Sequence, residues 1–244
     1  MADFLLIHGA WHGGWCWERV VPLLEAAGHR AYTPTLSGLE QDRTEPVDGI
    51  GIGTHVEDVF DAASGISTDR LVLVGHSYAG FPMTGAADRL RDRVAHYVYL
   101  DAGVPEEMSP GASFAWSDGT PPEEREKRLE AVVDLGLGPI LQAPPPEAFG
   151  VESAADRELL ATKTRPMPAG TFTDRFTFTN AGTDGLPRTF IHSVDPAYPP
   201  LGGTADRVEA DPSWRFHELQ SGHDSMLIDP EALTELLLGI TEAI

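Results

Sequence analysis

A serine lies where the chain must turn sharply from an apolar run into a stretch that can form a helix. Ser77 is the central residue of Gly-His-Ser-Tyr-Ala over 75–79, which follows the apolar run 71–74 and precedes a helix predicted over 81–90. Small residues around a serine at such a turn are typical of a nucleophile elbow, which lifts the hydroxyl above the edge of a sheet. The fifth position is alanine rather than the glycine of the strict pattern, but it remains small. We therefore expect Ser77 to attack an acyl carbon.

A serine hydroxyl is a weak nucleophile at neutral pH, so Ser77 needs a neighbouring base. His223 fits this role, because it lies in a loop between the last predicted strand, 215–219, and the last predicted helix, 229–240. The other eight histidines are placed less well for it. They are His8 and His12 near the N-terminus, His76 inside the elbow, His29 and His55 in helical or turn segments, and His96, His192 and His217 in or beside strands.

The base needs an acid that orients it, and two aspartates follow predicted strands. Asp195 is the favoured candidate, because it gives the order serine, acid, histidine on successive late strands. Asp101 is the alternative, since it lies just beyond the predicted strand 97–100, which follows the nucleophile helix. Asp101 is also explained as a turn or helix-capping residue.

Acyl transfer also needs backbone N–H groups that stabilise the negative charge of the tetrahedral intermediate. His8-Gly9-Ala10 follows the first predicted strand, and Tyr78 follows the nucleophile. We expect the backbone N–H groups of Ala10 and Tyr78 to form this oxyanion hole. Trp11 is close enough in sequence to line the substrate pocket, although a tryptophan more often packs in a core or at its rim.

The elements that must position these residues alternate between strands and helices. Apolar runs predict strands, and residues at helical spacing predict helices between them, which is the pattern of a parallel sheet covered by helices in the α/β class. The predicted strands are 4–7, 31–33, 71–74, 97–100, 189–192 and 215–219. The principal predicted helices are 17–27, 52–63, 81–90 and 229–240.

The segment of about 105–182 interrupts this alternation with many prolines, glycines and acidic residues. Within it, helices are predicted over 123–135 and 154–162. We expect a single domain over 1–244, with this segment inserted after the strand ending near Leu100 as a helical cap that encloses a pocket. The alternative is a surface insertion without a role at the site.

Composition excludes several partners. The 244 residues carry a formal net charge of −21, which disfavours nucleic acid and anionic membrane surfaces. The N-terminal residues lack the pattern of a signal peptide and no run is long enough to span a membrane, so a cytoplasmic location is expected. The single cysteine, Cys16, excludes an intrachain disulfide and is best explained as a small buried residue. No metal-binding motif is present. A homodimer remains open.

Together these motifs resemble a known family of enzymes. The run His8 to Trp17, Gly38, the elbow at 75–80 and Gly222-His223 are similar to the α/β-hydrolases of the plant methylesterase and hydroxynitrile lyase group, with their bacterial esterase relatives. The resemblance covers nearly the whole chain. It implies an α/β-hydrolase fold, a helical cap, a serine-histidine-aspartate triad without a cofactor, and a small-molecule substrate that is an ester of an apolar or aromatic acid.

Two alternatives to ester hydrolysis stay open. Lyases of the resembling group carry a lysine after the histidine and a threonine in the oxyanion loop, where this chain has Asp224 and Trp11. An acidic residue would oppose a departing anion, which disfavours the lyase, although Asp224 is also explained as the N-cap of a helix beginning near Ser225. The second alternative is a ligand-binding or proton-transfer protein of the same fold, which would not require a covalently modified Ser77.

Overall fold

Six strands form one sheet in the order β11-β10-β4-β3-β1-β2, and all neighbouring strands run parallel. The computed structural model describes residues 1–242. The strands are β1 (Asp3–Ile7), β2 (Arg30–Tyr32), β3 (Leu71–His76), β4 (Val94–Leu100), β10 (Arg188–Ser193) and β11 (Arg215–Leu219). Each contains or overlaps a predicted strand, so the predicted α/β class and parallel sheet are confirmed.

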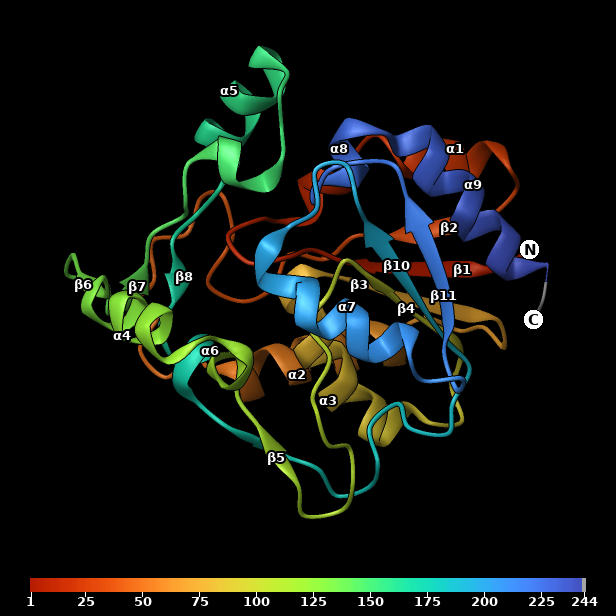
Figure 1. Cartoon of the computed structure of the whole chain (residues 1–244), viewed down its shortest axis with the longest axis horizontal. Coiled ribbons are helices and arrows are strands. Elements are labelled where there is room, and N and C mark those ends of the chain that lie inside the picture. Colours follow the sequence, from red (N-terminus) through yellow and green to blue (C-terminus); the bar gives the residue numbers. More distant parts are fainter. Residues whose placement is uncertain (243–244) are drawn as a thin grey trace.

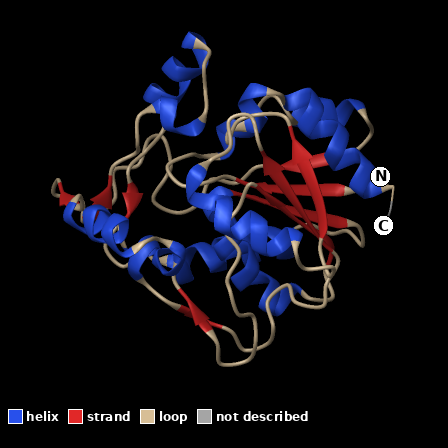
Figure 2. Ribbon diagram, in the orientation of Figure 1, coloured by secondary structure: helices blue, strands red, loops and turns tan. Residues whose placement is uncertain are grey.

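Helices cover both faces of this sheet (Figures 1 and 2). In the view of Figure 1, α1 (Val21–Ala26), α8 (Ser225–Ile228) and α9 (Pro230–Thr241) lie above the sheet, and α2 (Ile52–Gly65) and α3 (Gly80–Leu90) lie below it. Strands β1 and β3 are buried along their whole length. Their continuous apolar runs, without polar alternation, reflect this coverage on two faces.

The helix predicted over 17–27 is shorter than expected. Residues Gly14–Trp17 form a 3-10 turn, and α1 begins only at Val21, with Pro22 in its first turn. Proline is tolerated in that position because the N–H it lacks has no helical partner there. Gly28, with a φ of 84°, follows the end of the helix as predicted.

The segment between β4 and β10 is built from short elements that lie to the left of the sheet in Figure 1. They are β5 (Ser113–Phe114), α4 (Pro122–Glu130), β6 (Val133–Asp134), β7 (Pro139–Leu141), α5 (Ala154–Lys163), β8 (Met167–Pro168), α6 (Gly170–Thr173) and β9 (Phe176–Thr177). Strands β5 and β9 pair, and β6, β7 and β8 form a second small sheet. We keep the name cap for residues 105–182; its exact bounds and the single-domain organisation stay predictions, and residues 243–244 lie outside the described part.

One predicted cap helix is wrong at its C-terminal end. The prediction extended it to Leu135, but α4 ends at Glu130. Residues 133–134 instead pair with β7, and Gly136 and Gly138 adopt positive φ values of 91° and 92° in the turn between these strands. Antiparallel pairing and a glycine turn therefore replace the last helical turn. The second cap helix was predicted over 154–162, and α5 extends one residue further.

All strands of a parallel sheet end at one edge, and the loops that follow them carry the predicted site residues. Within residues 1–242, the only non-glycine residues with positive φ are Trp11, Ser77 and Asp101, at 64°, 54° and 40°. Each follows a strand of the sheet, at its carboxyl end. Such strained backbone is frequent where a loop must present a functional side chain. In the same described part, no helix combines the length and apolar character needed to cross a membrane.

Candidate active site

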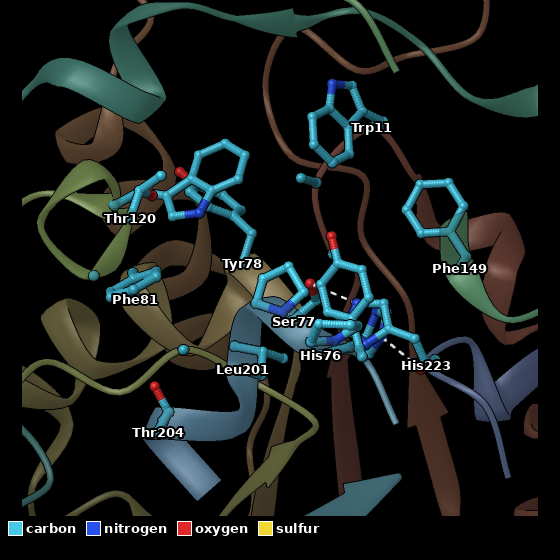
Figure 3. Close-up of a pocket in the computed structure, with 18 of the residues that line it drawn as sticks. Trp11, His76, Ser77, Tyr78, Phe81, Thr120, Phe149, Leu201, Thr204 and His223 are labelled. Atoms are coloured by element: carbon cyan, nitrogen blue, oxygen red, sulfur yellow. Dashed lines mark hydrogen bonds between the residues drawn. The ribbon is translucent and has the colours of Figure 1, made fainter. Parts of the chain in front are cut away.

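Ser77, His223 and Asp101 form a continuous chain of hydrogen bonds. The Ser77 hydroxyl donates to His223 Nε2 over 2.9 Å, and His223 Nδ1–H donates to Asp101 Oδ2 over 2.6 Å. These residues follow β3, β11 and β4, respectively. In this arrangement the imidazole can take a proton from the serine while the carboxylate holds the ring in the required tautomer. Figure 3 shows Ser77 and His223 facing each other at the base of a cavity.

The structure brings Asp101 to the histidine, so the preference for Asp195 as the hydrogen-bonded acid is wrong. Asp195 lies two residues beyond the end of β10, and its side chain is exposed. It contributes only its backbone N–H, which donates to the Ser221 carbonyl in the histidine loop over 3.0 Å. Asp101 directly follows β4, the strand adjacent to β3, and its side chain is completely buried. The strand order therefore places Asp101, rather than Asp195, beside the strand that leads to Ser77.

A second histidine, which was not predicted as a site residue, also binds Asp101. His192 Nδ1 donates to Asp101 Oδ1 over 2.9 Å, from its place in β10. Burial acts to raise the pKa of Asp101, but the hydrogen bonds from His192 and His223 outweigh it and lower the pKa to about 2. The hydrogen bond to the carboxylate raises the pKa of His192. Asp101 is therefore a carboxylate at neutral pH, with both oxygens engaged.

The elbow can form only because its small residues let backbones approach. A Cβ atom at Gly80 would lie 2.0 Å from the Gly103 carbonyl oxygen, and one at Gly75 would lie 3.1 Å from the Ala79 carbonyl oxygen. The Gly103 N–H also donates to the Ser77 carbonyl over 2.9 Å. The turn that carries Ser77 thus packs directly on the loop after β4, which carries Asp101.

The loop after β1 lies against the elbow, where the oxyanion hole was predicted. A Cβ atom at Gly9 would lie 3.0 Å from Ser77 Cβ, so the backbone here approaches Ser77 closely. Ala10 and Tyr78 both line the cavity beside Ser77. The Tyr78 hydroxyl donates to His55 Nδ1 over 3.0 Å, and His55 Nε2–H donates to the Ser37 carbonyl, which anchors the Tyr78 side chain away from the reacting groups. The assignment of the two N–H groups as the oxyanion hole stays a prediction.

The cavity above Ser77 has a volume of about 380 Å³ and mostly aromatic or aliphatic walls. Figure 3 shows Trp11 and Phe149 on one side of it and Phe81, Thr120, Leu201 and Thr204 on the other. The Trp11 side chain is only 8% exposed, and its Nε1–H donates to the Leu141 carbonyl in the cap. The predicted pocket position of Trp11 agrees with this placement. Glu124 and Arg128 of α4 add charged groups to the wall.

Two further groups of the site were not selected from sequence. The Tyr198 ring stacks on His223, with ring centroids 4.0 Å apart and an angle of 21° between the planes. Asp224 does not cap α8 through its side chain, contrary to one of its explanations from sequence. It instead accepts a hydrogen bond from His12 Nε2 over 3.1 Å. No sequence pattern indicates these pairings, because the partners are far apart along the chain.

The described residues contain one group that approaches metal-binding geometry. Ligand atoms of His76, His223 and Asp224 lie within 4.8 Å of one another. Both ring nitrogens of His223 are already engaged, with Ser77 and Asp101. The group is therefore better explained by the hydrogen bonds of His223 to Ser77 and Asp101 than by a metal site.

Comparisons with known proteins find relatives over nearly the whole chain. The sequence model described as the alpha/beta hydrolase family matches residues 4–236. A carbendazim-hydrolyzing esterase of Nocardioides sp. is 32% identical over 246 residues, which cover 98% of this chain and 100% of that esterase. Methylesterase 3 of Arabidopsis thaliana is 27% identical over 252 residues, covering 97% of this chain and 94% of the methylesterase.

Solved structures give the same result for the fold. An extracellular alpha/beta-hydrolase from a Paenibacillus species superposes with a TM-score of 0.82 at 20% identity, over 98% of both chains. A methylesterase from Arabidopsis superposes with a TM-score of 0.78 at 22% identity, over the whole of both chains. At these identities the likeness establishes the fold, and the chemistry must be argued from the residues.

Proposed function

Because the chain belongs to the alpha/beta hydrolase family, we propose that it is a serine hydrolase that cleaves carboxylic esters of small apolar or aromatic acids through an acyl-enzyme intermediate. One observation carries the proposal. The hydrogen-bonded chain Ser77–His223–Asp101 opens on an apolar cavity at the carboxyl edge of the sheet. The proposed roles are nucleophile for Ser77, base for His223 and orienting acid for Asp101.

In the acylation step, Ser77 Oγ attacks the carbonyl carbon of the ester while His223 Nε2 takes the hydroxyl proton. The carbonyl oxygen becomes negatively charged, and the N–H groups of Ala10 and Tyr78 stabilise it. The intermediate then collapses, the bond to the alcohol oxygen breaks, and His223 returns its proton to the departing alcohol. The acyl group remains bound to Ser77.

In the deacylation step, water takes the place of the alcohol. His223 accepts a proton from the water, whose oxygen attacks the acyl carbon and forms a second tetrahedral intermediate. Collapse breaks the bond to Ser77 Oγ and returns the proton to the serine. The acid product leaves, and Asp101 stays ionised throughout because its hydrogen bonds hold its pKa at about 2.

The cavity supports a small ester with an apolar or aromatic acid part. Trp11, Trp116 and Phe149 surround the space above Ser77 and offer flat faces to a ring. The names of the relatives agree with such substrates, since one is an esterase that hydrolyses carbendazim and another is a methylesterase. We infer that the alcohol part is short and that the acid part occupies the aromatic side of the cavity.

The lyase alternative is not favoured by the site. Asp224 occupies the position where the lyases of this group carry a lysine, and its side chain is 0% exposed and bound to His12. The charge of Asp224 therefore lies behind the triad rather than in the cavity. The residue that follows His223 is an acid, so it supplies no positive charge to stabilise a departing anion in the way the lyase requires.

The cytoplasmic location and a homodimer remain predictions.

Ester hydrolysis is tested by a covalent probe together with turnover. Wild type, Ser77→Ala and the control Ser64→Ala, an exposed serine at the end of α2, are treated with an organophosphonate and measured by intact mass. We expect one adduct on wild type and Ser64→Ala and none on Ser77→Ala. Hydrolysis of short-chain aryl esters should fall by roughly 10⁶-fold in Ser77→Ala, because the nucleophile is lost. Bound metabolite without an adduct or turnover would instead support the ligand-binding alternative.

A further inference from the structure

Three buried polar side chains lie behind Ser77, His223 and Asp101, in the loop after β1, at the end of β3 and in the loop after β11. His12 lies two residues after Ala10, His76 immediately precedes Ser77, and Asp224 immediately follows His223. Their side chains are 1%, 1% and 0% exposed. We call His12, His76 and Asp224 the support cluster. It connects the oxyanion loop, the elbow and the histidine loop away from solvent.

The hydrogen-bond partners of His12 determine where its protons lie. His12 Nδ1 is 2.7 Å from the Ala10 carbonyl oxygen, which can only accept, so Nδ1 carries a proton. His12 Nε2 is 3.1 Å from Asp224 Oδ2. Burial acts to lower the pKa of His12, but the neighbouring carboxylate raises it overall, and His12 in turn lowers the pKa of Asp224 against burial. Both ring nitrogens face acceptors and both pKa shifts favour the charged forms, so we infer that the pair is an imidazolium and a carboxylate.

The remaining groups that face this pair are uncharged or already engaged. Burial and the nearby His223 lower the pKa of His76 to about 3, so His76 is neutral and donates from Nε2 to the His223 carbonyl over 3.0 Å. Burial raises the pKa of the Cys16 thiol, which stays protonated. The rings of Trp15 and Phe149 pack on His12. Among the described residues, no lysine or arginine contacts Asp224, so His12 balances its charge.

We propose that His12 and Asp224 are positioning residues that hold the oxyanion loop in register with Ser77 and His223. The inference rests on the proposed function, because it concerns the stabilisation of the oxyanion in ester hydrolysis. The bond from His12 restrains the backbone of Ala10, the residue whose N–H is proposed to face the oxyanion. Asp224 restrains His12 and is the next residue in the chain after His223, the proposed base. The pair therefore couples the position of the oxyanion donor to that of His223.

The geometry leaves little freedom for this loop to adjust without the pair. Gly9 already lies so close to the elbow that a Cβ atom there would be 2.8 Å from His76 Nδ1. A displacement of the Ala10 N–H weakens its bond to the oxyanion more than it affects the binding of the uncharged ester. Loss of the pair should therefore lower kcat much more than it raises KM.

The test compares an ester with its thiono analogue, in which sulfur replaces the carbonyl oxygen and accepts hydrogen bonds poorly. We expect Asp224→Ala and His12→Ala each to lose about 10- to 100-fold in kcat on the oxygen ester, less than the cost of removing an oxyanion donor outright. The loss on the thiono ester should be only a few-fold. The double variant should be no worse than either single variant, because both act through one interaction. Asp224→Asn should recover most of the activity, since its amide can donate to a neutral His12.

A matched control is a buried carboxylate outside the site. Asp88 is 2% exposed and accepts hydrogen bonds from Thr179 and Asn180. Asp88→Asn should lower the thermal midpoint without changing the preference for the oxygen ester. If Asp224→Ala does not fold, His12→Gln takes its place in the test. The side-chain amide of glutamine can reach only one of the two acceptors that His12 binds, which are the Ala10 carbonyl and Asp224. Equal losses on both esters, multiplicative losses in the double variant, or an Asn variant no better than Ala would overturn the proposal.

A spectroscopic measurement separates this inference from the proposed function. The ¹⁵N shifts of the His12 ring at pH 7, assigned by their loss in His12→Gln, should show both nitrogens protonated in wild type and only Nδ1 protonated in Asp224→Asn. A neutral ring in wild type would overturn the pair whatever the activity. Wild type that hydrolyses neither ester, yet has a doubly protonated ring, would refute ester hydrolysis and the positioning role with it while leaving the ion pair established.

Discussion

At the scale of single residues, Asp101 is the point where the site is most tightly constrained. One oxygen of its carboxylate binds His223 and the other binds His192, and its backbone N–H donates to the Ile191 carbonyl over 2.7 Å. A carboxylate completely removed from water is costly unless it is paired and hydrogen-bonded. The two histidines meet this requirement, and the result is an acid whose orientation toward His223 is held from both sides.

The identity of the acid is tested by comparing Asp101→Asn with Asp195→Asn. The first change removes the charge that stabilises the imidazolium and favours the correct tautomer, so kcat should fall by roughly 10⁴-fold. The second change alters an exposed side chain and should affect kcat less than about two-fold. Steady-state hydrolysis of an aryl ester measures kcat for both variants, and circular dichroism establishes that they fold. A larger loss of kcat in Asp195→Asn than in Asp101→Asn would return the role of orienting acid to Asp195.

At the scale of elements, the site depends on how closely the loops at the strand ends pack on one another. Helix α3 begins at Gly80, directly against the Gly103 carbonyl in the loop after β4. This contact holds the elbow next to the acid, since Gly103 also binds the Ser77 carbonyl. The position therefore requires a glycine because of the space available rather than a special φ.

Gly80→Ala should consequently destabilise the fold. The added methyl group would meet the Gly103 carbonyl at 2.0 Å, so backbone must shift, with an expected loss of about 1–3 kcal/mol in the free energy of unfolding. Gly53→Ala is the control, because Gly53 is exposed in α2 and no atom lies within 4 Å of its added methyl group. That change should stabilise by up to about 1 kcal/mol. Urea unfolding measures the free energy of unfolding of both variants. A value for Gly80→Ala equal to that of wild type would contradict the packing argument.

At the scale of the whole molecule, the cap and the sheet meet at the oxyanion loop and together enclose the cavity. The cap binds Trp11 twice, through the Leu141 carbonyl at 3.1 Å and through the Arg165 N–H at 2.8 Å from the Trp11 carbonyl. Trp116 of the cap packs on Tyr78 beside Ser77, with ring centroids 4.9 Å apart. The part of the chain that sets the size of the cavity therefore also stabilises the loop proposed to hold the oxyanion.

Trp116→Ala should change which esters are hydrolysed. Removing this ring enlarges the cavity above Ser77, so kcat/KM for an ester of a bulky acid should rise relative to that for an acetate ester by roughly 10-fold. Leu129→Ala is the control, because this residue of α4 is 44% exposed and does not line the cavity. Its substrate preference should match wild type. An unchanged ratio in Trp116→Ala would show that the acid part binds elsewhere.

The sequence by itself determined the α/β sheet and indicated Ser77 and His223 as the candidate nucleophile and base. Small residues around Ser77 between a strand and a helix are a local pattern, and the alternation of apolar runs with helical periodicity is equally local. Short-range preferences of this kind do not depend on how distant segments meet. The position of His223 between the last strand and the last helix could be inferred for the same reason.

Only the tertiary structure decided between Asp101 and Asp195 and revealed the bond between His12 and Asp224. Asp101 and His223 are 122 residues apart in the chain, and His12 and Asp224 are 212 apart. Both aspartates follow strands, so the pattern of the chain cannot separate them. The strand order and the direction of each side chain choose between them, because these set which buried carboxylate finds a partner and which remains in water.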